Sequence, residues 1–469
     1  MKNYLKRAAM CFALILLVVS CAEEDVLVNN EALNTSNLAK KIKTPGFADN
    51  NMVLYWNEKT ELVLSAPGPQ PSRARFFAII QIAVHDALNN IKPKYQRYAL
   101  LNERRKFADP DAAVASAAYW AIKGLNRQGA FAANLETWYI QSLATIPDGE
   151  SKELGKTLGK NAADAIIAKR ANDGLLQVIF FTDLLPNGVN PGEYRSTLTA
   201  LNWIPQTTLA STRNVSNWGT VMQPYVIESN YQFRPTGPYP VTSNEYTTDF
   251  NEVKTKGARV GGIRSADEEK KGKFWSENRP SIIWNHIVRQ AIENKKLDAW
   301  KTARLFALMH VSMAESINSA LNGSYHYYSW RPETAIRLAD NDGNDNTQGN
   351  PDWLPVLSET PTSVSPPVPG YPSGFAAYGG TTAEILRLFF ETDKTSIAIT
   401  TTSTHPAVPV DPAQKPSFQY SSFSQAARDN SLSLIYNGWD FRKSALDGEE
   451  MGRQIANYVF NHHFRENDE

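Results

Sequence analysis

The sequence predicts a mainly α-helical protein with one large domain and long loops. Apolar residues recur every three to four positions over much of the chain, which is the spacing of one helix face. Strand and helix patterns do not alternate as they do in βαβ units, and no segment repeats with a fixed period. Two stretches, at about 180–245 and 338–372, are rich in Pro and Asn and predict loops that wrap the helices.

Individual helices are predicted from apolar spacing and from prolines at helix boundaries. The first runs from residue 72 to residue 91, where Phe76 and Ile80 share one face between Pro71 and Pro93. Further helices are predicted over residues 111–125, 135–144, 151–171, 246–256, 266–276, 280–294, 297–320, 376–390, 423–435 and 447–464, and a loop is predicted over residues 394–420.

The first 20 residues have the pattern of a bacterial signal peptide. Three basic residues precede an uncharged apolar run over residues 8–19, which is too short to span a bilayer comfortably. The run ends in Val18-Val19-Ser20-Cys21, which resembles a bacterial lipobox. We therefore expect cleavage before Cys21 and attachment of lipid to this residue. An ordinary signal peptide that is cleaved nearby is the alternative.

These features divide the chain into three predicted parts. Residues 1–20 are the signal peptide, residues 21–50 are the lipidated Cys21 with a flexible tether, and residues 51–469 are a single domain. The lipid would hold the protein at a membrane surface with its globular body in water. Ala22 and the acidic residues that follow it favour the bacterial outer membrane, on either of its faces.

Composition excludes several classes of protein. Lys+Arg and Asp+Glu each number 48 in 469 residues, so no basic excess favours nucleic acid as a partner. Both cysteines lie in the first 21 residues, which leaves neither a disulfide framework nor a Cys-rich metal site for the body. We therefore predict no nucleic-acid partner and no bound metal.

Common catalytic motifs are absent, and the histidines do not suggest a site by themselves. There is no Gly-rich phosphate loop, no His-Glu-x-x-His and no Gly-x-Ser-x-Gly. His85 and Asp86 lie among apolar residues of a predicted helix, which favours a hydrogen bond in the core over a catalytic dyad. His310 is predicted to pack in the core, and the His462-His463 pair is predicted to lie on the surface.

Three polar and aromatic segments stand out, at residues 324–337, 371–378 and 433–442. In order and spacing they resemble the motifs of the vanadium-dependent haloperoxidases, whose superfamily includes the type 2 phosphatidic acid phosphatases. The resemblance extends over most of residues 55–465. It implies a helical fold of two four-helix bundles and a site that traps an oxyanion.

The resemblance also implies a role for each motif position. In the family, a lysine, two arginines, a serine hydroxyl and a glycine N–H hold the oxygens of vanadate or phosphate. One histidine bonds the vanadium or attacks the phosphorus, and another is the acid–base partner. The family residue is present here as Arg331, Ser373, Gly374 and Gly438. The lysine, the acid–base histidine, the second arginine and the axial histidine are replaced, in that order, by Ser324, Phe375, Leu434 and Asp440.

These replacements predict that the family reaction is lost. A cation at 4 Å from an oxyanion contributes about 4 kcal/mol at an effective dielectric constant near 20, and two cations are missing. Phe375 cannot transfer a proton, and an ionised Asp440 would repel vanadate and phosphate alike. We therefore expect no vanadate cofactor. The alternative is an enzyme that still oxidises halides or hydrolyses phosphate esters, either with altered catalytic groups or with cations supplied by a loop.

Two outcomes are open for the pocket itself. Arg331 and Asp440 are predicted to form a buried ion pair in place of the ligand. A pocket filled by Phe375, Leu434 and Trp439 is favoured over a rebuilt site for a polar neutral molecule such as a sugar. In a rebuilt site, His326 would be the neighbour that could act as a base. The sequence thus predicts a lipoprotein with a binding or scaffolding role, and it does not identify the protein partner.

Overall fold

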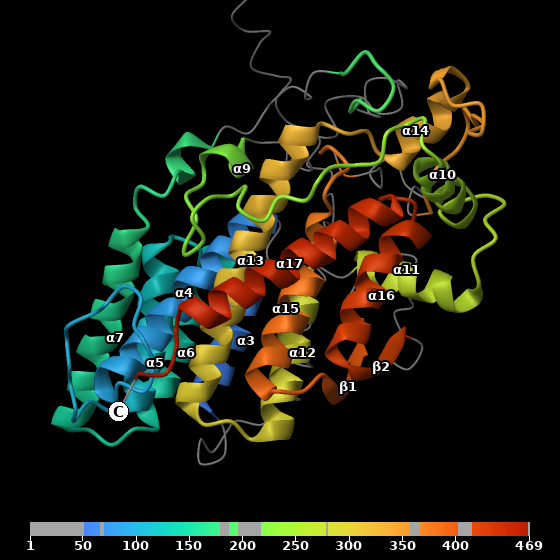
Figure 1. Ribbon diagram of the computed structural model, residues 1–469. Coiled ribbons are helices and arrows are strands. Elements are labelled where there is room, and N and C mark those ends of the chain that lie inside the picture. The colour runs from blue at the N-terminus through green and yellow to red at the C-terminus, as the bar shows by residue number, and fades with distance from the viewer. Residues whose placement is uncertain are drawn as a thin grey trace, which may run out of the picture. The chain divides into compact units, whose positions relative to one another are not determined.

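Helices make up most of the described chain, which confirms the predicted fold class (Figure 1). The computed structural model describes residues 51–65, 70–178, 187–195, 217–277, 280–356, 366, 368–401 and 415–467. Residues Asn51–Glu469 form one compact unit. The predicted signal peptide, lipidated Cys21 and tether lie outside the described residues and stay predictions. No described helix is long and apolar enough to cross a membrane.

One group of helices comes from the N-terminal part of the compact unit. Its members are α3 (Met52–Leu64), α4 (Gln70–Ile91), α5 (Pro110–Gly124), α6 (Ala132–Ala144) and α7 (Glu150–Lys169). The α5 helix is rich in alanine and packs along α7, and α4 contacts both. Gly159 of α7 allows this close approach, because a Cβ there would lie 2.3 Å from the Ala113 carbonyl oxygen of α5.

A second group of helices surrounds α15. Its members are α12 (Pro280–Lys295), α13 (Ala299–Tyr327), α15 (Gly374–Phe390), α16 (Phe423–Tyr436) and α17 (Arg442–His462). The α13 helix packs against α4 on one side and against α15 and α17 on the other, so it joins the two groups (Figure 1). The described residues also form the helices α9 (Trp218–Val221), α10 (Asn244–Lys256), α11 (Ala266–Glu277) and α14 (Pro332–Leu338).

Some elements differ from the prediction. Helices α3 and α14 were not expected, α13 continues to Tyr327, and α17 begins already at Arg442. The prediction of a loop over residues 394–420 is wrong at both ends, because β1 (Lys394–Thr400) and β2 (Ser417–Ser422) form an antiparallel pair. Buried Ile397 and Ile399 alternate with exposed residues in β1, which is the period of a strand with one buried face.

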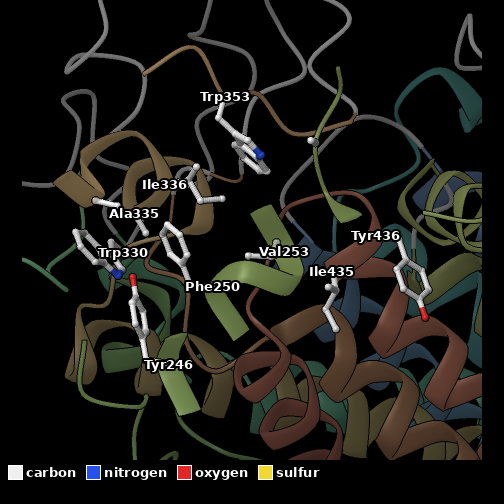
Figure 2. Close-up of a cluster of buried hydrophobic side chains, with 11 residues drawn as sticks. Tyr246, Phe250, Val253, Trp330, Ala335, Ile336, Trp353, Ile435 and Tyr436 are labelled. Carbon is white, nitrogen blue, oxygen red and sulfur yellow. The ribbon is translucent and has the colours of Figure 1, made fainter. Parts of the chain in front are cut away.

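An aromatic cluster holds two of the three motif segments. Tyr246 and Phe250 of α10 pack with Trp330, Ile435 and Tyr436, as Figure 2 shows. The rings of Tyr246 and Trp330 are stacked with their centroids 6.4 Å apart. Because Trp330 precedes the first motif arginine and Ile435 lies within the third motif, this packing fixes the backbone on both sides of the candidate site.

The predicted structural histidines are confirmed. His85 and Asp86 are both fully buried in α4, and His85 Nδ1 lies 3.1 Å from Asp86 Oδ1. The Asp86 carboxylate also accepts hydrogen bonds from the backbone N–H groups of residues 98–100. His310 is buried and stacks on Phe77, with ring centroids 4.4 Å apart. Both histidines therefore belong to the core.

Candidate functional site

A cavity of about 260 Å³ lies where the three motif segments meet. The α13 helix forms one side, the segment from Pro366 to Phe375 forms another, and Trp439 with Asp440 closes a third. Its lining includes seven of the site residues singled out in the sequence: Ser324, Arg331, Ser373, Gly374, Phe375, Trp439 and Asp440. The motif spacing thus brings together residues that lie more than 100 positions apart.

The predicted ion pair between Arg331 and Asp440 is confirmed. Arg331 stands directly before α14, and its Nη1 lies 2.7 Å from Asp440 Oδ1. The same Nη1 donates to the Trp439 carbonyl oxygen at 3.0 Å, and Nε donates to the Val368 carbonyl oxygen at 2.8 Å. The two charged side chains are only 9% and 5% exposed. The pair therefore forms one polar end of the cavity and is almost removed from water.

The surroundings of Asp440 determine its charge. Burial raises the pKa of the Asp440 carboxyl above its ordinary value, while the Arg331 charge and a hydrogen bond from Ser373 oppose this shift. The adjacent guanidinium is thus the strongest of the effects that favour the ionised carboxylate against burial. Loss of Arg331 would leave a buried carboxyl that takes up a proton far more readily.

Ser373 is placed by the close approach of α15 and α17. It is the N-cap of α15, where its hydroxyl accepts from the Ala376 N–H, and its own N–H donates to the Ser444 carbonyl oxygen at 3.1 Å. A Cβ at Gly448 of α17 would lie 2.3 Å from the Ser373 carbonyl oxygen. Glycine at position 448 therefore lets the two helices bring Ser373 beside Asp440.

The cavity is open, so the prediction of a filled pocket is wrong. Phe375 and Trp439 form its wall, with ring centroids 6.0 Å apart, and do not occupy its centre. Leu434 does not reach the lining, because it is buried in a cluster with Ala376 and Ala445. The side-chain volume expected to close the pocket is therefore used in packing α16 against α15 and α17.

Two further predicted residues lie away from the cavity. His326 is exposed near the end of α13 and does not line the cavity, so the structure does not place it as a base for a ligand there. Gly438 has a φ of +82° and its N–H donates to the Ile435 carbonyl oxygen at 3.0 Å. That N–H is thus engaged within the turn after α16. Among the described residues that line the cavity, Arg331 is the only cation and there is no histidine.

Sequence reasoning missed the apolar part of the lining. Ile317 and Leu321 precede Ser324 on the same face of α13, and Val368 and Pro369 face them from the loop before α15. The helical spacing of positions 317, 321 and 324 was a usable signal, because residues four and seven positions apart share a face. The described residues contain no group of three or more His, Cys, Asp or Glu side chains that could hold a metal ion.

Comparisons with known proteins agree with this architecture. A family model described as the VCPO second helical-bundle domain matches residues 304–469, which include all three motif segments. The vanadium chloroperoxidase of Curvularia inaequalis is 22% identical over an alignment of 421 residues that covers 75% of this chain and 67% of that protein. The chain is thus similar in sequence to a vanadium chloroperoxidase, and its residues 304–469 match the second helical-bundle domain of that family.

Solved structures of the superfamily share the fold of this chain. The first bacterial vanadium-dependent iodoperoxidase superposes with a TM-score of 0.64 at 22% identity, over 86% of this chain and 93% of that one. The holo form of a bacterial vanadium-dependent chloroperoxidase gives a TM-score of 0.63 at 15% identity, over 84% of this chain and 92% of that one. The haloperoxidase helical architecture therefore extends over nearly the whole compact unit.

Proposed function

We propose that this protein is a membrane-anchored lipoprotein whose haloperoxidase-like domain binds or scaffolds, and that the oxyanion chemistry of the superfamily is lost. The observation that supports this most is the ion pair between Arg331 and Asp440. The Asp440 carboxylate stands at the position of the axial histidine. It pairs with the Arg331 guanidinium, which would otherwise face a ligand. The cavity thus has no net charge to attract an oxyanion.

The residues present do not fit vanadate or phosphate. An oxyanion next to Asp440 would meet a negative charge in a site from which water is largely excluded, where charge repulsion is strong. The Arg331 guanidinium cannot turn toward it without leaving Asp440 buried and unpaired. Phe375 supplies no proton at the position of the acid–base histidine. Together these features support a binding role over either enzymatic alternative.

Equilibrium dialysis against orthovanadate tests the loss of oxyanion binding. We expect no saturable binding to the purified protein at millimolar vanadate. The triple variant Ser324→Lys, Phe375→His and Asp440→His changes only cavity-lining positions and is the matched positive control. It adds cationic groups and removes the competing carboxylate, so we expect it to gain vanadate binding. Micromolar binding by the unchanged protein would instead favour an active superfamily enzyme.

The membrane anchor is part of the same proposal and has its own test. In cells fed a fatty acid that carries a chemical tag, we expect the tag on the full chain and its loss in the Cys21→Ala variant. Cys11→Ala is the matched control and is expected to keep the tag, because Cys11 lies inside the predicted signal peptide and is removed with it. A Cys21→Ala variant that keeps the tag would contradict lipid attachment at this residue.

A further inference from the structure

We propose that the cavity at the former oxyanion site binds a small, uncharged and mainly apolar molecule that has one hydrogen-bonding group at one end. The inference rests on the proposed function, because it requires that the oxyanion site be lost. Three properties of the cavity support it, namely its apolar walls, its single neutral polar end and its size.

Apolar side chains form most of the cavity wall. Ile317 and Leu321 project from α13, Val368 and Pro369 lie opposite, and Trp439 closes one side. Such walls favour an apolar ligand, because the transfer of its apolar surface from water into the cavity contributes favourable free energy of binding. A sugar, which the sequence suggested, would bring many hydroxyl groups to a wall that offers few partners for them.

Three polar groups of the lining, those of Arg331, Ser373 and Asp440, lie together and carry no net charge. Arg331 and Asp440 neutralise each other at 2.7 Å, and the hydroxyl groups of Ser324 and Ser373 lie in the same lining. An anion would be repelled by Asp440 and a cation by Arg331. A single hydroxyl or carbonyl group, in contrast, can exchange a hydrogen bond with the Ser324 hydroxyl without disturbing the pair.

The volume limits the size of the molecule. At about 260 Å³ the cavity lies just below the lower end of the range that is typical for drug-sized ligands, about 300–1,000 Å³. A second cavity, of about 310 Å³, lies beside Tyr239, Val241 and Asp249 and is separate from the first. Any experiment with an apolar probe must therefore distinguish between these two cavities.

A pair of fluorescent probes with one skeleton tests the proposal on the full chain. N-phenyl-1-naphthylamine is uncharged, and 1-anilinonaphthalene-8-sulfonate adds a sulfonate to the same rings. We expect the uncharged probe to bind at least about tenfold more tightly than the sulfonate, which is a difference of about 1.4 kcal/mol. Equal or tighter binding of the sulfonate would overturn the inference, because it would show that the site still selects an anion.

A matched pair of variants then locates the bound probe. Val368 and Val241 are both partly buried loop residues, but Val368 lines the cavity at the former oxyanion site and Val241 lines the second one. Val368→Trp fills the first cavity, so we expect binding of the uncharged probe to weaken at least about tenfold. Val241→Trp is expected to change it less than about twofold. The reverse pattern would place the probe in the second cavity and overturn the inference.

The two proposals fail separately. A protein that binds neither vanadate nor the uncharged probe would overturn the ligand class while leaving the loss of oxyanion chemistry intact. Tight binding of vanadate would overturn the proposed function directly, whatever the probes do. If Val368→Trp does not fold, Val241→Trp still distinguishes the two cavities, because weakened binding of the uncharged probe to that variant would place the probe in the second cavity.

Discussion

The Arg331→Met substitution is expected to lower the free energy of unfolding by about 3–5 kcal/mol, because it leaves a buried charge without its partner. Asp440 is 5% exposed in its side chain and lies 2.7 Å from Arg331 Nη1. The substitution also removes the hydrogen bonds to the carbonyl oxygens of Val368 and Trp439. Unfolding in guanidinium chloride, followed by circular dichroism, measures the change.

An exposed ion pair and a double variant are the controls. Lys160 and Asp164 of α7 form a pair at 2.5 Å whose side chains are 45% and 56% exposed. Lys160→Met is therefore expected to cost less than about 1 kcal/mol. In Arg331→Met/Asp440→Leu no charge is left unpaired, so most of the lost stability should return. The explanation is contradicted if Arg331→Met costs no more than Lys160→Met.

The cost of Arg331→Met should also depend on pH. Burial already raises the pKa of Asp440, and the lost cation no longer opposes this shift. A raised pKa in the folded state means that the folded protein retains a proton that the unfolded chain has released. Stability is then lost as the pH rises through the folded pKa. We therefore expect Arg331→Met to be less destabilising at pH 5 than at pH 8.

Apolar periodicity predicted most of the long helices because each buries one continuous face. Helix α3 was missed, although Val53, Trp56, Thr60 and Val63 follow helical spacing, because the charged segment at residues 58–61 interrupts the apolar pattern. Helix α14 was missed for another reason. It has only 7 residues and starts at Pro332, which by itself indicates only a boundary.

Motif spacing predicted which residues meet, but it could not predict which way each side chain points. The ion pair between Arg331 and Asp440 follows from the spacing and from charge. The position of His326 does not. A helix turns by about 100° per residue, so the residue two positions after Ser324 points to nearly the opposite side of α13. Ser324 accordingly lines the cavity, while His326 is exposed.

The open cavity also depends on information that a linear pattern lacks. Leu434 was expected in the pocket because it occupies the position of a family arginine. A long arginine and a shorter leucine need not point the same way, and Leu434 packs with Ala376 and Ala445 in the interior. Whether a pocket closes is thus decided by the packing of neighbouring helices, which only the three-dimensional structure contains.

Glu315 of α13 is expected to make the stability of the fold depend on pH. The residue is fully buried, and its Oε1 accepts hydrogen bonds from the backbone N–H groups of Tyr225, Val226 and Ile227 at 2.7, 2.6 and 3.2 Å. Within the described chain, its Oε2 has no hydrogen-bond partner. Burial raises the pKa of Glu315 to about 7, although the three N–H groups favour the ionised form.

The sign of the effect follows from this shift. Between the ordinary value of 4.5 and about 7, the unfolded chain releases the proton while the folded protein keeps it. The contribution of Glu315 to stability is therefore fully present below pH 4.5 and is lost as the pH rises through about 7. At a slope of at most about 1.4 kcal/mol per pH unit, the loss between pH 5 and pH 7 is about 2 kcal/mol.

Glu315→Gln separates this contribution from those of all other groups. Glutamine keeps an oxygen that accepts hydrogen bonds from the three N–H groups, and it does not titrate. The free energy of unfolding of the variant should therefore fall less steeply between pH 5 and pH 7 than that of the unchanged protein. Denaturant unfolding at each pH measures both proteins, and Glu450→Gln, at an exposed position of α17, is the control that should leave the slope unchanged. Equal slopes for Glu315→Gln and the unchanged protein would mean that the three N–H groups keep Glu315 ionised. In that case the backbone N–H groups, together with the positive charge of Arg170, would stabilise a buried charge at the contact between α13 and residues 225–227.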